Sequence, residues 1–257
     1  MKQQLEHIPI NDAMECAGEC PLCYIENRIE EHALDFVLGY GASYMESDTR
    51  EMTDNAGFCR AHFKKMFDYG NSLGNAWILS THYKKIINEM DDEFKKFKPG
   101  KEKSSIGSLL KKGSTSEYSN SIIAWIQNKE DSCFICDRVN RSFDDYINVF
   151  FSMYKKDSDF REKIKKSQGF CLSHFGELCK GADRYLNATQ LEEFYGIMLP
   201  LMQENMERIH EDICWLIEKY DYRNKDADWK NSKDANQRGM QKLKGGYPGK
   251  EAYKMKK

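Results

Sequence analysis

Hydrophobic side chains recur at intervals of three and four residues along most of the chain. Over residues 25–44 and 139–154 this spacing predicts two helices that each bury one face. Over residues 73–97 and 191–220 it predicts two longer helices. Gly70 and Gly181 each favour the end of a short helix just before a long one. The pattern as a whole predicts an all-α fold.

One pattern of cysteine and histidine occurs twice. A Cys-x2-Cys pair is followed by Gly-Phe-Cys-x2-His-Phe, and the two copies lie 113 residues apart at the first cysteine and 112 at the histidine. The pattern predicts two tandem helical repeats, with each motif at the start of a helix. We expect repeats at residues 1–97 and 120–222, a polar linker at 98–119 and a tail at 223–257. The motif residues are Cys20, Cys23, Cys59 and His62, then Cys133, Cys136, Cys171 and His174.

Each copy supplies three thiolates and one imidazole, which is a complete tetrahedral ligand set for zinc. We therefore predict two zinc ions per chain. The loops between the two half-motifs are nearly equal in the two copies, which favours a centre within each repeat. Pairing of a half-motif from one repeat with a half-motif from the other stays open. Four protein ligands leave no open position for water or substrate, so the sites are expected to be structural rather than catalytic.

Iron is the alternative metal, because an iron–sulfur cluster can also take three cysteines and a histidine. Cys16, Cys20 and Cys23 have the spacing C-x3-C-x2-C, which resembles the cluster-binding signature of radical S-adenosylmethionine enzymes. The chain departs from that signature at Leu22, where the family has an aromatic residue, and the second copy has Lys129 where the extra cysteine would lie. Cys16, Cys179 and Cys214 are therefore left without a role in metal binding.

Composition places the chain among folded proteins of one or two domains. Its 257 residues are 40% hydrophobic and 12% aromatic, enough for a substantial core. The first residues lack the apolar segment of a signal peptide, and no apolar run is long enough to span a membrane. We expect a cytoplasmic protein, in which nine cysteines favour metal or thiol chemistry over disulfides.

The net charge of -2 is the sum of two unlike parts. Residues 223–257 contain 11 basic and 4 acidic side chains, a balance of +7, which leaves -9 for residues 1–222. The tail also contains Trp229, Tyr247 and Tyr253 and has little helical periodicity. We expect an extended arm that can contact a protein or a nucleic acid.

The repeated pairing of Cys-Pro-Leu-Cys with Gly-Phe-Cys-x2-His-Phe resembles an uncharacterised bacterial family of anaerobic Gram-positive organisms, a domain of unknown function. The resemblance covers roughly residues 15–220 and implies no known activity. An anaerobic lineage would favour iron somewhat.

Three hypotheses for function follow. The first is a non-enzymatic, zinc-stabilised helical protein that acts as a macromolecular interaction module. The second is an iron–sulfur or thiol-based redox or ligand-binding protein. The third is an enzyme with a pocket between the repeats.

Overall fold

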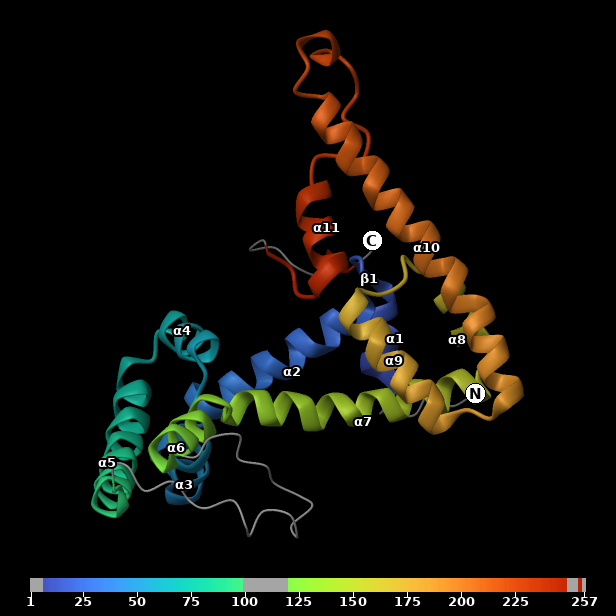
Figure 1. Cartoon of the computed structure of the whole chain (residues 1–257). Helices are drawn as coiled ribbons and strands as arrows, with labels where there is room; N and C mark the ends of the chain where they lie inside the picture. Colours follow the sequence, from blue (N-terminus) through green and yellow to red (C-terminus); the bar gives the residue numbers. More distant parts are fainter. Residues whose placement is uncertain (1–6, 99–119, 249–253, 256–257) are drawn as a thin grey trace. The chain divides into compact units, whose positions relative to one another are not determined.

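The computed structural model describes residues 7–98, 120–248 and 254–255, and its fold is all-α, as predicted (Figure 1). The predicted linker at 98–119 lies almost entirely outside the described residues. The contacts of the chain divide it into two compact units, residues 1–29 with 141–257 and residues 30–140. These units cut across the two sequence repeats, because each unit takes part of both.

The first unit is built on helices from both ends of the chain. It contains α1 (Ile8–Glu15), the start of α2 (Pro21–Leu38), most of α7 (Phe134–Lys156), α8 (Ser158–Lys165), α9 (Leu172–Tyr185) and α10 (Ala188–Glu218). Its core is a cluster of aromatic rings in which Phe150 meets Phe160 edge to face at 5.1 Å between ring centroids. Phe151 packs against Phe194 in the same cluster. These rings come from α7, α8 and α10, so they fix the frame on which α9 is held.

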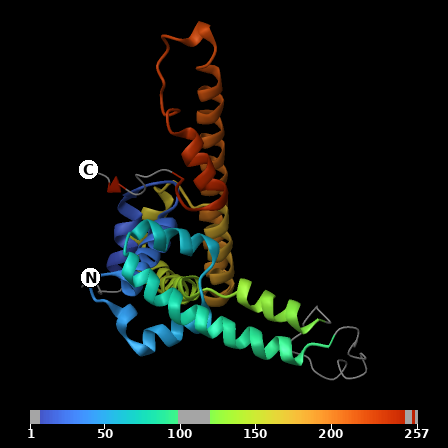
Figure 2. The same ribbon diagram turned by 90° about the vertical axis from the view of Figure 1, so that its left-hand side faces the viewer.

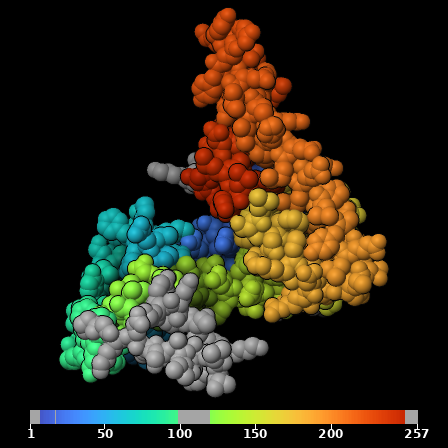
Figure 3. Space-filling view, in the orientation of Figure 1, coloured from blue at the N-terminus to red at the C-terminus, as the bar shows by residue number. Residues whose placement is uncertain are grey.

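The described part of the C-terminal tail contains helices, which corrects the expectation of an extended arm. It contains η4 (Tyr222–Asn224) and α11 (Ala235–Lys244), and α11 packs against α10 and α9 (Figures 1 and 3). A short antiparallel pairing joins β1 (Cys16–Ala17) to β2 (Lys254–Met255). The sequence did not predict α11 because its hydrophobic periodicity is weak. Part of its inward face is polar, and Gln241 and Lys242 are buried there.

The second unit contains η2 (Ser43–Met45), α3 (Ser47–Ala56), α4 (Arg60–Tyr69), α5 (Ser72–Lys96) and α6 (Ser121–Glu130), with the end of α2 and the start of α7. Its buried side chains include Val37, Met66 and Ile78. Phe134 stacks on Phe36 and meets Phe58 edge to face. In Figure 2, α5 is the helix of this unit nearest the viewer.

The same order of helices follows each Cys-x2-Cys pair: long, short, short, long. The second short helix of the first copy, α4, contains His62 and ends as predicted near Gly70, which is its C-cap in a left-handed conformation at φ 86°. The expected end at Gly181 is wrong, because α9 continues to Tyr185. A Cβ atom at Gly181 would lie 2.4 Å from the ring of Phe151, so this glycine permits close helix packing rather than a helix end.

Among the helices that the structure describes, none combines the length and the apolar character needed to cross a membrane.

Candidate metal centres

The eight motif residues meet in two groups of four, and each group combines half-motifs from different repeats. Cys20 and Cys23 meet Cys171 and His174, which we call the α2–α9 centre. Cys59 and His62 meet Cys133 and Cys136, which we call the α4–α7 centre. The expectation of a centre within each repeat is therefore wrong. The eight residues are those named from the sequence, and their partners are exchanged.

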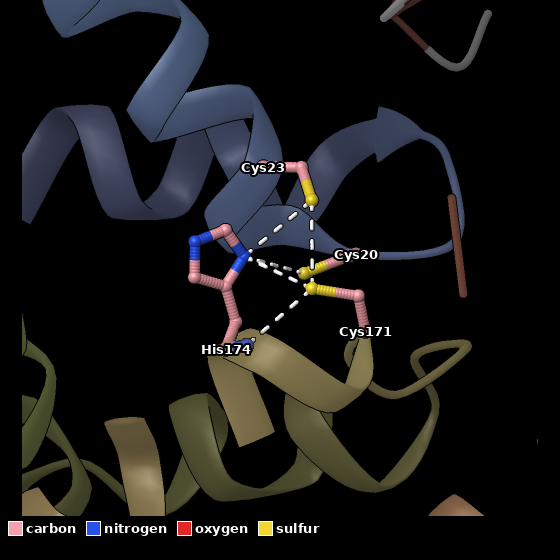
Figure 4. Close-up of side chains that lie close together, drawn as sticks. All are labelled: Cys20, Cys23, Cys171 and His174. Atoms are coloured by element: carbon pink, nitrogen blue, oxygen red, sulfur yellow. Dashed lines mark hydrogen bonds between the residues drawn. The ribbon is translucent and has the colours of Figure 1, made fainter. Parts of the chain in front are cut away.

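In the α2–α9 centre, the Nδ1 atom of His174 faces three sulfur atoms (Figure 4). It lies 3.4 Å from Cys20 Sγ, 3.4 Å from Cys23 Sγ and 3.2 Å from Cys171 Sγ. The sulfur atoms of Cys23 and Cys171 are 3.7 Å apart. All four side chains are buried.

The α4–α7 centre has the same arrangement with different exposure. His62 Nδ1 lies 3.3 Å from Cys59 Sγ, 3.2 Å from Cys133 Sγ and 3.4 Å from Cys136 Sγ. The sulfur atoms of Cys59 and Cys136 are 3.9 Å apart. His62 and Cys133 are buried, whereas Cys59 and Cys136 are only half-buried.

These distances fit one tetrahedral metal ion in each centre. Zinc bonds of about 2.3 Å to sulfur and about 2.0 Å to nitrogen give tetrahedral edges of about 3.8 Å between sulfurs and about 3.5 Å between sulfur and nitrogen. The measured edges are 3.7 and 3.9 Å between sulfurs and 3.2 to 3.4 Å to nitrogen. An ion would therefore require only small movements of the ligands.

Four helix N-termini present the cysteines. Cys20 and Cys133 directly precede α2 and α7, and Cys59 and Cys171 are the N-cap residues of α4 and α9. Cys171 Sγ accepts a hydrogen bond from the backbone N–H of His174 at 3.4 Å. The positive ends of the helix dipoles favour thiolates, and they would partly offset the charge of -1 on a zinc ion with three thiolates. Placement at helix starts agrees with the sequence prediction.

Each histidine has a carboxylate at its other ring nitrogen. His62 Nε2 lies 2.8 Å from Glu30 Oε1, and Lys65 pairs with the same carboxylate. His174 Nε2 lies 3.5 Å from Glu26 Oε2. Such a partner orients a metal-binding imidazole and keeps Nδ1 free for the ion. Glu26 and Glu30 were missed in the sequence because acidic residues are frequent along α2.

The pKa values of the ligands in the α4–α7 centre shift in different directions. Burial alone would lower the pKa of His62, but hydrogen bonds to Cys133 and Glu30 outweigh it and raise the pKa to about 10. Burial opposes ionisation of Cys133 as well, yet contact with His62 lowers its pKa to about 6. Burial and the neighbouring Cys133 raise the pKa of Cys136 to about 12.

The α2–α9 centre shows the same pattern. Burial alone would lower the pKa of His174, but contacts with Cys171 and Cys20 raise it to about 10. Hydrogen bonds from Cys20, Cys23 and His174 lower the pKa of Cys171, whereas contacts with Cys171 and Cys20 raise that of Cys23. Three crowded sulfurs therefore cannot all ionise without a cation, and metal binding would release protons.

The α2–α9 centre also has a cover that the sequence did not indicate. A Cβ atom at Gly245, which has φ 77°, would lie 3.4 Å from Cys171 Sγ and 3.6 Å from Cys23 Sγ. The chain after α11 thus passes directly over two of the sulfurs. Close by, Lys242 Nζ donates hydrogen bonds to the carbonyl oxygens of Gln168 and Glu19.

The remaining three cysteines lie outside both groups, and none of the nine forms a disulfide. Cys16 is buried in β1, so the C-x3-C-x2-C spacing does not bring three sulfurs into one site. Burial raises the pKa of Cys179. Cys214 Sγ lies 3.6 Å from His210 Nε2, one helical turn away on α10.

The fold and the two centres define an all-α protein with two Cys/His groups that could hold metal ions. The chain belongs to a family described as "Family of unknown function (DUF6062)", which matches residues 1–250. The match includes most of the tail, so it extends beyond the range of roughly 15–220 expected from the motifs. No curated protein and no solved structure matches the chain.

Proposed function

We propose that this protein is a non-enzymatic, zinc-stabilised helical protein that acts as a macromolecular interaction module. The observation that carries the proposal is the convergence of three sulfurs and one imidazole nitrogen in each centre. Four protein ligands complete the coordination of zinc and leave no position for a substrate. Each ion therefore has a structural role.

The gain in stability from each ion follows from the distances in sequence that it bridges. Cys23 and Cys171 are 148 residues apart, and Cys59 and Cys136 are 77 residues apart. Closing such loops with a metal restricts the unfolded chain strongly, so metal binding becomes folding free energy. Because each centre takes half-motifs from both repeats, neither repeat can complete a centre alone.

A single ion suits the centres better than a multi-iron cluster. All ligand atoms of a group lie within 4.8 Å of one another. That space fits one ion with bonds of about 2.3 Å, whereas a cluster of several iron and sulfide atoms would require the sulfurs to move apart. Mixed thiolate and imidazole ligands favour zinc among single ions.

The interaction role is supported by apolar side chains on the surface of the second unit. Leu73, Tyr83 and Phe94 on α5 are each more than half exposed, at 62%, 63% and 53%. Exposed apolar surface of this kind is typical of contact surfaces. The tail gives weaker support for nucleic-acid binding than its charge indicated, because Arg223 pairs with Asp221 and Arg238 pairs with Asp212 and Asp234.

Metal analysis of protein purified without oxygen tests the proposal. We expect about two zinc ions per chain and no visible absorption, since zinc has a filled d shell. Cys59→Ser and Cys171→Ser should each lose about one ion and lower the thermal midpoint, whereas Cys214→Ser, outside both groups, should keep both ions. Brown protein with iron and sulfide would contradict the zinc assignment. Unchanged metal content in both ligand variants would contradict both centres.

A further inference from the structure

The outer face of α5 has an apolar stripe directly opposite its packed face. Gly74 and Ile78 are buried against the unit, whereas Leu73, Tyr83, Ile87 and Phe94 point away from it. Ile87 is 54% exposed. At 100° per residue these side chains fall on one side of the helix. The described part of the chain places no helix over this stripe.

The stripe has the heptad spacing of a coiled coil. Positions 73, 76, 80, 83, 87, 90 and 94 alternate steps of three and four residues, and they carry Leu, Ala, Ser, Tyr, Ile, Met and Phe. A strict seven-residue repeat over about three heptads favours pairing with another helix rather than burial in a globular core. α5 has 25 residues and no proline, so it can present the whole seam.

The charges beside the seam select an antiparallel partner identical to α5. Lys84 and Asp91 occupy the same flanking position in successive heptads, and both are exposed; Asp91 also pairs with Lys95 on its own helix. When two copies pair antiparallel with Ile87 beside Met90 of the other copy, Lys84 of each copy faces Asp91 of the other. A parallel pair would bring Leu79 and Ile86 to these charges instead and would form no such ion pair.

We propose that two copies of this chain associate through α5 as an antiparallel helix pair. The pairing buries Tyr83, Ile87 and Phe94 of both copies and forms two Lys84–Asp91 ion pairs related by the two-fold axis. The proposal specifies the partner for the interaction role proposed above, and it is independent of the metal assignment, because none of the eight candidate ligands lies on α5.

Light scattering coupled to size-exclusion chromatography tests the pairing on the full chain. We expect twice the chain mass of 30.1 kDa at micromolar concentration. Ile87→Lys places a charge in the seam and should weaken association at least about tenfold, which corresponds to about 1.4 kcal/mol. The matched control is Ile217→Lys, at an exposed apolar position on α10, which should remain dimeric. Helicity by circular dichroism and metal content should stay unchanged in both variants, which separates failure of the dimer from failure of the metal centres.

A charge exchange tests the antiparallel register. Lys84→Asp brings two like-charged pairs together and should weaken association about threefold to tenfold. The double variant Lys84→Asp with Asp91→Lys should bind more tightly than Lys84→Asp alone, because it restores both ion pairs in reverse, although it also removes the pair between Lys95 and Asp91 within the helix. A monomer at all concentrations, or a dimer unaffected by Ile87→Lys, would overturn the proposal. Failure of the double variant to recover would overturn the antiparallel register.

Discussion

The two candidate centres use the same set of ligands, three cysteines and one histidine, in opposite order along the chain, and they differ in what protects them. In the α2–α9 centre all four ligands are buried, and the chain at Gly245 passes over two sulfurs. In the α4–α7 centre Cys59 and Cys136 are half-buried. The repeat therefore dictates the ligand set, whereas the unrepeated tail decides how far solvent reaches it.

The segments beside the two centres are joined in different ways. Near the α4–α7 centre, the Ser132 hydroxyl donates a hydrogen bond to the Ala56 carbonyl at 2.6 Å, and Phe134 N–H donates to the Gly57 carbonyl at 2.9 Å. At the corresponding place near the α2–α9 centre, Glu19 stands where the other copy has Ser132. There Lys242 from α11 bridges the carbonyls of Glu19 and Gln168.

Among the substitutions that test the difference between the two centres, removal of the Lys242 bridge should lower the unfolding free energy most. Lys242 is 1% exposed, and its Nζ lies 3.6 Å from the fully buried carboxylate of Glu19. Lys242→Met removes one of three cations around the Glu19 carboxylate, where Arg208 and Arg238 remain, and takes this donor from two carbonyls, so we expect a loss of about 2 to 3 kcal/mol in unfolding free energy. Denaturant titration measures this loss, with the exposed neighbour Lys244→Met as the control. Equal midpoints for the two variants would show that the bridge contributes nothing.

Substitution of the carboxylates beside the histidines should lower the zinc affinity of the two centres by different amounts. Glu30 lies 2.8 Å from His62 Nε2, whereas the Glu26 carboxylate lies 3.5 Å from His174 Nε2 and is about half exposed. Glu30→Gln should lower zinc affinity of the α4–α7 centre about 10- to 100-fold, a typical effect of such partners. Glu26→Gln should change the affinity of the other centre by less. Competition with a chromophoric chelator measures both, and the reverse order would contradict the assignment of these carboxylates.

Exposure predicts which centre loses its metal first. With zinc bound, Cys59 and Cys136 should react with an alkylating reagent, and release zinc to a chelator, about tenfold faster than Cys23 and Cys171. Mass spectrometry of the modified cysteines identifies the order. Lys242→Met should bring the rates at the two centres closer together, because it loosens the chain at Gly245 that covers the α2–α9 centre. Equal rates at the two centres in the unmodified chain would show that the tail does not shield the sulfurs.

Gly245→Ala should produce the smallest of these effects. The glycine has φ 77° and ψ -178°, a region almost exclusive to glycine, which a residue with a side chain adopts at a penalty of about 1 kcal/mol or more. Its new Cβ atom would also touch Cys171 Sγ at 3.4 Å. We expect a loss of about 1 kcal/mol in unfolding free energy and faster zinc release from the α2–α9 centre only. Gly246→Ala, which has a similar φ and open space around it, separates the backbone effect from the contact.

The helices and the eight candidate ligands could be predicted from the sequence because periodicity and motif spacing are local. The pairing of half-motifs could not be predicted in this way. The near-equal loops between the half-motifs favoured a centre within each repeat, but the lengths of the helices within those loops determine which half-motifs meet. α2 has 18 residues and spans about 27 Å, whereas α3 has 10 residues and spans about 15 Å. α3 is therefore too short to lead the chain back along the whole of α2, and Cys59 and His62 are grouped with Cys133 and Cys136 of the other repeat.

The tail was misjudged for an electrostatic reason. Its excess of basic residues indicated an external anionic partner, but Arg238 and Lys242 instead meet Glu19 and Asp212 within the first unit. Part of the opposite charges of tail and body therefore compensate each other inside the fold. Net charge alone does not distinguish these two outcomes.

The exchanged pairing also sets an order for synthesis on the ribosome. The ligands occur along the chain as an outer pair enclosing an inner one, so the α4–α7 centre has all its ligands once Cys136 has emerged. Cys171 is synthesised 148 residues after Cys23. At about 5–20 residues per second, this interval lasts about 7 to 30 s. During that interval the thiols of Cys20 and Cys23 have no Cys171 or His174 to complete their centre, and the chain at Gly245, which covers Cys23 in the folded protein, is made later still.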